Sequence, residues 1–191
     1  MMSNSVFFTS DTHFGHKKLS DLRGFPNVEV HDQTLIDNWN SVITKGDRVY
    51  HLGDVALGCK KERTIEILSS LNGQIYLLRG NHDDRIFSDS DICKRFVWCR
   101  SEHYFTVNDQ KIHLLHYAMR VWRSSHRGSW HLYGHSHGSL RDAFYDEKSL
   151  SMDVGVDCHN FTPISFEQVA DRMRNKQFSP VDHHGDHSSS F

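Results

Sequence analysis

The segment 74–84 constrains the fold of this chain most, because a short apolar run ends there in a glycine and a polar cluster. Residues 74–78 read Gln-Ile-Tyr-Leu-Leu and are followed by Arg79-Gly80-Asn81-His82-Asp83-Asp84. The apolar run is typical of a short buried strand, and Gly80 lets the backbone turn at its carboxyl end. Ligands bind at the carboxyl ends of strands in open α/β folds, so we expect a functional site at this turn.

Two earlier apolar runs end in a similar way. Residues 6–10 lead into Asp11-Thr12-His13, and residues 48–52 lead into Gly53-Asp54. Asp11 and His13 are two residues apart, so an extended backbone would place both side chains on one side, within reach of one ion. The alternative is that Asp11 or Thr12 caps the next helix.

Helical patterns separate these predicted strands. Residues 32–43 carry apolar side chains at helical spacing, and residues 60–71 form a second amphipathic pattern that stops at Asn72-Gly73. The first half of the chain therefore has the order β-α-β-α-β, which predicts a layered α/β fold.

The C-terminal half predicts further strands with histidines at their ends. The segments with strand composition are residues 95–98, 104–107, 111–115, 130–133 and 149–157. A turn sequence at 108–110 predicts a hairpin, and His116 follows its second arm. His135 and His137 follow the next strand with the same two-residue spacing as Asp11 and His13. Ser165-Phe166-Glu167-Gln168 is typical of a capping box that starts a short helix.

Length and composition limit the class of protein. The 191 residues suit one domain, predicted over residues 1–178, and the formal net charge of -2 indicates no basic nucleic-acid surface. No long apolar segment or leader pattern is present, so we expect a cytoplasmic protein with four reduced cysteines. Residues 179–191 are predicted to form a flexible tail with solvated histidines. The 16 histidines are an excess that needs a chemical explanation.

Five strand ends thus carry, in order, Asp-x-His, Gly-Asp, Gly-Asn-His-Asp, His and Gly-His-x-His. With these elements in this order, the chain resembles the calcineurin-like metallophosphoesterases in their compact bacterial or phage form, from about Val6 to Asp157. The resemblance implies a layered α-β-β-α sandwich with two mixed sheets. It also implies a phosphoesterase that uses two divalent transition-metal ions per chain.

The resemblance assigns seven metal ligands, which are Asp11, His13, Asp54, Asn81, His116, His135 and His137. One ion would be held by Asp11, His13, Asp54 and His137, and the second by Asp54, Asn81, His116 and His135, with Asp54 bridging. Oxygen and imidazole donors without thiolate suit Mn, Fe, Co, Ni or Zn and do not select among them. Two such ions would leave a net positive site that attracts phosphate and lowers the pKa of water.

The same motif suggests roles for neighbouring residues. His82 is predicted to be the general acid, with Asp83 orienting its imidazole; the alternative for His82 is a buried, hydrogen-bonded histidine. His16 and Arg79 are expected either to contact the phosphate or to support a ligand. The segment 117–129, which includes Arg120 and Trp122, either shapes the pocket or is a solvated loop.

Three functions are compatible with these residues. The leading prediction is hydrolysis of a small phosphate ester, with phosphodiesters favoured over monoesters and no membrane partner. A nuclease is the second, but the sequence offers neither a basic surface nor an appended DNA-binding segment. A non-catalytic metal-binding interaction module is the third, and it would be expected to lack some ligands, whereas here every ligand position is filled.

Overall fold

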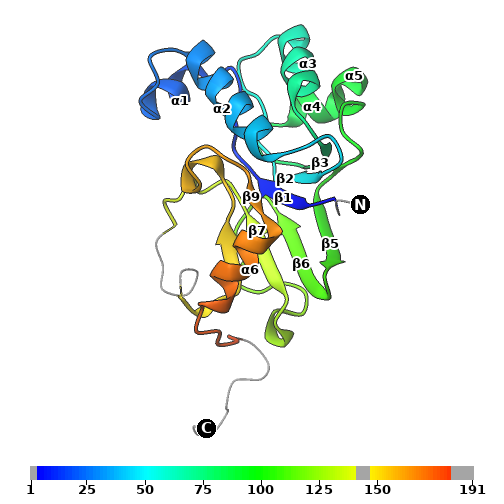
Figure 1. Cartoon of the computed structure of the whole chain (residues 1–191), viewed down its shortest axis with the longest axis vertical. Coiled ribbons are helices and arrows are strands. Elements are labelled where there is room, and N and C mark those ends of the chain that lie inside the picture. Colours follow the sequence, from blue (N-terminus) through cyan, green and yellow to red (C-terminus); the bar gives the residue numbers. More distant parts are fainter. Residues whose placement is uncertain (1–3, 141–146, 182–191) are drawn as a thin grey trace, which may run out of the picture.

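Two mixed β-sheets form the centre of the structure, a computed structural model that describes residues 4–140 and 147–181 (Figure 1). The first sheet has the order β4 (Cys99–Arg100), β3 (Gln74–Leu78), β2 (Arg48–His51), β1 (Val6–Thr9) and β9 (Ile164–Ser165). The second has the order β5 (Glu102–Val107), β6 (Gln110–Leu115), β7 (Trp130–Tyr133) and β8 (Ser151–Asp153). The pairs β1–β9 and β5–β6 are antiparallel, and the other pairs are parallel. The prediction of an α/β fold with two mixed sheets is confirmed.

Helices cover the outer face of the first sheet. They are α2 (Val28–Val42), α3 (Lys61–Ser70), α4 (Asp84–Ser88) and α5 (Ser90–Cys93). Side chains alternate between the faces of a strand, so Phe7 and Val49 point toward these helices and pack with Trp39 and Ile67. The helical pattern predicted from residue 32 therefore buries the face that we expected, but α2 begins earlier because Asn27 caps it through the N–H of Val30.

A second core lies between the two sheets. Phe8 and Tyr50 point into it from the first sheet, and Leu114 and Leu132 point into it from the second. Helix α6 (Phe166–Arg174) packs its residue Val169 into the same core and begins with the predicted capping box. These two cores hold both sheets rigidly, so the turns at their strand ends have fixed positions relative to one another.

Two predicted strands differ from the structure. Residues 95–98 precede β4 rather than form a strand, because the chain is still turning after α5, with the N–H of Phe96 on the carbonyl of Cys93. The strand predicted over 149–157 is confined to β8, because the chain leaves the sheet to donate from Val156 to the carbonyl of Ser10 and then enters the 3-10 helix η3 (Val156–Cys158). The hairpin of β5 and β6 is confirmed, and Asn108 and Asp109 adopt the positive φ angles that a tight hairpin turn requires.

A short helix after the first ligand turn was not predicted. Helix α1 (Lys17–Leu22) begins after His16, so neither Asp11 nor Thr12 caps it. Strand β9 was also missed, because its two residues carry no periodic pattern. No helix in residues 4–140 or 147–181 is long and apolar enough to cross a membrane.

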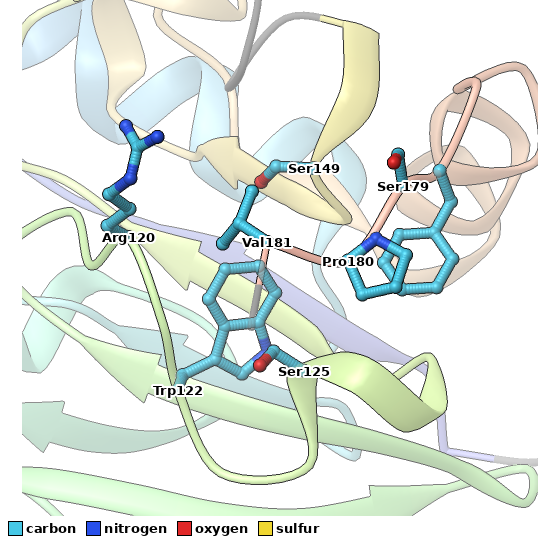
Figure 2. A pocket seen from close by; sticks show the side chains of 8 residues that line it. Arg120, Trp122, Ser125, Ser149, Ser179, Pro180 and Val181 are labelled. Atoms are coloured by element: carbon cyan, nitrogen blue, oxygen red, sulfur yellow. The ribbon is translucent and has the colours of Figure 1, made fainter. Parts of the chain in front are cut away.

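The chain after α6 packs against the segment 117–129, which contains Trp122. Ser179 donates its N–H to the carbonyl of Lys148, and residues 178–181 line a small cavity with Trp122 and Ser149 (Figure 2). Trp122 is buried and donates to the carbonyl of Ser129, so it is a packed residue, and no predicted ligand lines this cavity. Of the predicted tail, residues 182–191 lie outside the described residues, as do its three histidines.

Candidate metal centre

The seven predicted ligands lie on turns at the carboxyl ends of strands. Asp11 and His13 follow β1, Asp54 follows β2, Asn81 follows β3, His116 follows β6, and His135 and His137 follow β7. Strands β1, β2 and β3 are parallel neighbours, as are β6 and β7, so their carboxyl ends meet at one edge of the two sheets. The fold therefore brings together residues that are up to 126 positions apart in the sequence, from Asp11 to His137.

Five of these ligands have left-handed backbone conformations. The φ angles are 57° at Asp11, 48° at His13, 57° at Asp54, 65° at His135 and 48° at His137. Such conformations cost roughly 1–3 kcal/mol each for residues other than glycine and cluster at functional sites. The expectation that Asp11 and His13 share an extended backbone is therefore wrong. The two side chains converge through successive left-handed turns instead.

Neighbouring turns hold these conformations through backbone hydrogen bonds. Asp11 donates its N–H to the carbonyl of Gly53, and His13 donates to the carbonyl of Asp54, both at 3.0 Å. The turns touch so closely that a Cβ at Gly80 would collide with the backbone nitrogen and the carboxylate of Asp54. The glycine in the Gly-Asn-His-Asp motif is thus required by close approach of two ligand turns.

The first ligand group consists of Asp11, His13 and His137, whose ligand atoms lie within 4.8 Å of one another. Asp11 Oδ1 lies 3.9 Å from the Nε2 atoms of both His13 and His137. Asp11 and His13 are buried, and burial raises the pKa of Asp11 to about 7 and lowers the pKa of His13 to about 2. His13 is therefore a neutral imidazole at physiological pH, as a metal ligand must be.

The second ligand group consists of Asp54, His116 and His135, again with ligand atoms within 4.8 Å. His116 Nδ1 lies 2.7 Å from the carbonyl oxygen of Leu52, which can only accept, so this nitrogen carries the proton and Nε2 is free to ligate. The side-chain oxygen of Asn81 lies 3.0 Å from this Nε2 and 2.9 Å from His135 Nδ1. Asn81 therefore joins this group.

Asp54 lies between the two groups. Its Oδ2 atom is 3.5 Å from His13 Nε2 and 3.6 Å from His116 Nε2, while its Oδ1 atom accepts the backbone N–H of His82 at 2.8 Å. One carboxylate oxygen thus faces a histidine of each group, as a bridging ligand would.

The donor atoms fit cations. Asp11 Oδ1 and His13 Nε2 are buried without a hydrogen-bond partner among the described residues, which is costly unless another group satisfies them. In the second group, the lone pair of His116 Nε2 faces the oxygen of Asn81, and two acceptors so close would repel each other without a cation or a proton between them. Carboxylate, amide and imidazole donors suit a divalent transition metal.

Comparison with known proteins places these residues in a family. The sequence profile described as the Calcineurin-like phosphoesterase superfamily domain matches residues 5–158, which include all seven ligands. The chain belongs to this superfamily. Family membership implies divalent metal ions, and the two ligand groups are where this phosphoesterase fold would hold them.

Relatives of this superfamily member occur in archaea and phages. The uncharacterized protein MJ1445 of Methanocaldococcus jannaschii is 33% identical over 174 residues, covering 88% of this chain and 91% of that protein. The Gene 66 protein of Mycobacterium phage L5 is 44% identical over 111 residues, covering 56% of this chain and 53% of the phage protein. Among solved structures, the protein of unknown function AQ665 from Aquifex aeolicus has a TM-score of 0.71 at 22% identity, with 88% of this chain and 99% of that chain covered.

His82 and Asp83, the predicted catalytic pair, have different surroundings. His82 is exposed, and its ring centroid lies 5.6 Å from that of His13, which places it at the mouth of the metal centre. Asp83 is fully buried and accepts the backbone N–H groups of Asp54, Val55 and Gly80 at 2.7, 3.0 and 2.9 Å. No hydrogen bond between this carboxylate and the His82 ring occurs within the described part of the chain, so Asp83 holds the ligand turns instead.

Burial and hydrogen bonding have opposite effects on the pKa of Asp83. Burial raises its pKa to about 6, although the three backbone N–H groups favour the charged form and act in the opposite direction. Because this buried carboxylate accepts from three backbone N–H groups, it connects the turn after β2 to the turn after β3. This connection keeps Asp54 and Asn81 at a fixed separation.

The two predicted substrate contacts, Arg79 and His16, differ in their exposure to solvent. Arg79 is exposed, pairs with Asp84 at 2.7 Å and lies over the ring of Phe87, so its guanidinium is turned to the surface beside α4. His16 is half-buried, with its ring 5.7 Å from that of His13, and burial lowers its pKa. Of the two, His16 is the residue that the structure places beside a ligand.

His51 and Thr12 join two ligand turns through a hydrogen-bonded relay. The N–H of Gly53 donates to His51 Nδ1 at 3.2 Å, so His51 Nε2 carries the proton and donates to Thr12 Oγ1 at 2.9 Å. The Thr12 hydroxyl in turn donates to the carbonyl of Val55 at 2.8 Å. Burial lowers the pKa of His51 to about 3, which keeps it neutral for this role. His51 therefore supports two ligand turns from within its strand.

Arg23 and Asp157 were not predicted to take part in the site. Asp157 lies 2.7 Å from His137 Nδ1, and Arg23 binds Asp157 with two nitrogens at 2.8 and 2.6 Å. Burial alone would raise the pKa of Asp157, but the hydrogen bonds from His137 and Arg23 lower it below its usual range. The hydrogen bond that His137 donates to Asp157 also raises the pKa of His137. No local motif marks this pair, because the two residues are 134 positions apart.

Proposed function

We propose that this protein hydrolyses phosphate esters with two divalent metal ions, and that it prefers phosphodiesters to phosphomonoesters. The observation that carries the proposal is the pair of neighbouring ligand groups at the carboxyl edge of the two sheets, with Asp54 Oδ2 near one histidine of each. Asp11, His13, His137 and Asp54 would hold one ion, and Asp54, Asn81, His116 and His135 would hold the other. Two such ions, when bound, lower the pKa of water and stabilise the charge that builds on the phosphoryl group.

The protein's own groups supply positioning and proton transfer. Asn81, His82 and His135 are exposed, while Asp11, His13 and His116 are buried, so the ligand groups open to solvent on one side. A phosphate that approaches from this side meets His82, which can donate a proton to the departing oxygen. The fixed ligand turns orient the ester without rearrangement of the backbone.

The charge around the site favours diesters. A monoester carries more negative charge than a diester at neutral pH, because its second pKa is about 6. Two arginines near the ligand turns already have carboxylate partners, Arg23 with Asp157 and Arg79 with Asp84. An additional phosphate charge would have to compete with these carboxylates for either guanidinium. Support for a small ester over a nucleic-acid strand comes from the formal net charge of -2.

Hydrolysis of matched nitrophenyl esters tests the proposal. The purified protein, stripped with a chelator and reloaded with Mn, Fe, Co, Ni or Zn, should hydrolyse bis(4-nitrophenyl) phosphate with a higher kcat/KM than 4-nitrophenyl phosphate. His116→Ala should lose this activity, and Asp171→Asn, an exposed carboxylate paired with Arg174, should retain it. Equal activity of the stripped protein, or of His116→Ala, would refute a metal-dependent reaction, and a preference for the monoester would refute the diester assignment.

A gel shift with single- and double-stranded DNA and RNA tests the alternative of a nuclease. We expect no retardation at 50 mM salt. A shift that weakens steeply as salt increases, together with cleavage, would instead assign a nucleic-acid substrate.

A further inference from the structure

Arg23, at the C-terminal end of α1, has a hydrogen-bond partner at each of its three guanidinium nitrogens. A guanidinium has five N–H donors, and five contacts with acceptors surround this one. Nε lies 2.8 Å from Asp157 Oδ1, and Nη2 lies 2.6 Å from Asp157 Oδ2 and 2.8 Å from the carbonyl of Asp11. Nη1 lies 3.2 Å from the carbonyl of Thr12 and 2.9 Å from His31 Nε2. The side chain is only 3% exposed, so each donor needs such a partner.

Some of these contacts connect Arg23, through Asp157, to the predicted metal ligand His137. Asp157 Oδ2 binds Arg23 and lies 2.7 Å from His137 Nδ1. Because a carboxylate only accepts, the proton of the neutral imidazole lies on Nδ1, and Nε2 is left with its lone pair on the side of Asp11. Asp157 thereby selects the tautomer and the orientation of His137, and Arg23 fixes Asp157.

The remaining contacts connect Arg23 to the turn that carries Asp11 and His13. Arg23 holds the carbonyls of Asp11 and Thr12, and so stabilises the left-handed conformation of this turn. Its partner His31 uses Nδ1 on Asp32, whose carboxylate accepts the N–H of Gly15 at 3.0 Å. The contacts of Arg23 therefore reach the turn of Asp11 and His13 directly and His137 through Asp157, while Arg23 makes no hydrogen bond to a residue of the second group among the described residues.

We propose that Arg23 and Asp157 are positioning residues for the first ligand group: Asp157 orients His137, and Arg23 locks both Asp157 and the Asp11 turn. The inference rests on the proposed metal centre. A salt bridge that served only stability would not need to touch a ligand histidine and the backbone of two consecutive residues, Asp11 and Thr12, in a ligand turn. Replacing such supporting partners of a metal ligand weakens metal binding by about 10–100-fold.

The inference predicts a loss that is confined to one ion. Lysine keeps the charge of Arg23 but has three donors on one nitrogen, so it cannot bind Asp157 with two nitrogens and reach the two carbonyls as well. Arg23→Lys and Asp157→Asn should each weaken one of two bound ions by about 10–100-fold. The other ion should keep its wild-type affinity, because Asp54, Asn81, His116 and His135 make no contact with either residue among the hydrogen bonds of the described chain.

Mn²⁺ is a suitable probe, because electron paramagnetic resonance counts free and bound ions and distinguishes coupled pairs from single ions. Wild type should bind two Mn²⁺ with the spectrum of a coupled pair. At Mn²⁺ concentrations that saturate only wild type, Arg23→Lys and Asp157→Asn should bind one and show a single-ion spectrum. The matched controls are Arg174→Lys and Asp171→Asn, which alter an exposed arginine–aspartate pair and should leave both ions bound. Thermal melting of each metal-free variant shows whether it folds.

A double-mutant cycle tests whether Asp157 acts through His137. His137→Ala alone should lose the same ion, and Asp157→Asn should cause no further loss of Mn²⁺ affinity in that background. Wild-type binding of both ions by Arg23→Lys and Asp157→Asn, equal weakening of both ions, or additive loss in the cycle would overturn the inference while leaving the proposed function intact. Failure of the wild type to bind two Mn²⁺ would overturn both.

Discussion

Asp54 Oδ2 and His13 Nε2 lie 3.5 Å apart although their turns belong to different strands. The same oxygen lies 3.6 Å from His116 Nε2, so a single carboxylate faces histidines of both ligand groups. The other oxygen accepts the N–H of His82, which prevents the carboxylate from rotating away. This arrangement distinguishes Asp54 from the other carboxylate among the predicted ligands, Asp11, whose Oδ1 lies near His13 and His137 of the first group.

Asp54→Asn should therefore damage metal binding more than the loss of a ligand of one group. The amide removes the charge that both ions share, so the content should fall from two ions to fewer than one per chain, whereas His116→Ala should retain one. Elemental analysis after gel filtration measures this, with Asp37→Asn, an exposed carboxylate on α2, as the control. Two ions per chain in Asp54→Asn at wild-type affinity would refute the bridging role.

Asp83→Asn should destabilise the protein even without metal. Its carboxylate accepts three backbone N–H groups from two ligand turns, and an amide would turn a donor toward at least one of them. Losing a buried charged acceptor should cost about 2 kcal/mol or more of unfolding free energy, measured by urea titration with a chelator present. Asp84→Asn, next in sequence but exposed, should cost less than about 1 kcal/mol. Unchanged stability in Asp83→Asn, with an altered pH–rate profile, would instead restore its expected role in orienting His82.

The places of the seven predicted ligands at strand ends could be read from the sequence, because each lies within a few residues after an apolar run, whereas their assignment as metal ligands came from the family resemblance. The run predicts a buried strand, and a polar residue just after it has to lie at the strand end. Asp54 and Asn81 also follow glycines, whose small size permits the close approach of their turns. These signals are local, and they locate the site without any knowledge of how the sheets pair.

The supporting residues could not be predicted in this way. Arg23 belongs to the end of a six-residue helix, and its partner Asp157 lies in a 3-10 turn 134 positions later. The contact between them forms because the chain leaves β8 after Asp153 and reaches Ser10. The sequence predicted instead that the strand continues to Asp157. The hydrogen bonds of Asp83 could not be predicted for a related reason, since their donors are backbone N–H groups, which carry no side-chain signal.

Stability should fall in mild acid, and His131 should contribute to this fall. His131 is buried, with Nδ1 facing the carbonyl of His113 and Nε2 accepting the N–H of Met119. Burial lowers its pKa to about 4. The unfolded chain, with a pKa near 6.5, binds more protons than the folded chain between pH 4 and 6.5. Stability is therefore lost as the pH falls through this window, by at most about 1.4 kcal/mol per pH unit for one histidine.

His131→Gln removes this titration while keeping a donor and an acceptor in the side chain. Urea midpoints of wild type and variant between pH 4.5 and 7, with a chelator present, should show a shallower dependence on pH for the variant. His13 and His51 also have pKa values lowered by burial, so some dependence should persist. An identical slope in both proteins would contradict the assignment to His131.

His82→Ala should separate proton donation from metal binding. The His82 side chain belongs to neither ligand group, and its ring lies 5.6 Å from that of His13 between the ligands and solvent, so the variant should retain two ions per chain. A general acid contributes roughly 10²–10⁴-fold when the departing oxygen is a poor leaving group, and little when it is a good one. The variant should lose most activity toward a nucleoside phosphodiester with an alkoxide leaving group and keep much of its activity toward a nitrophenyl phosphodiester. His16→Ala, which alters the other histidine beside His13, should change both activities by the same factor. Equal loss of both activities in His82→Ala, with its ions in place, would mean that His82 stabilises charge on the phosphoryl group and donates no proton.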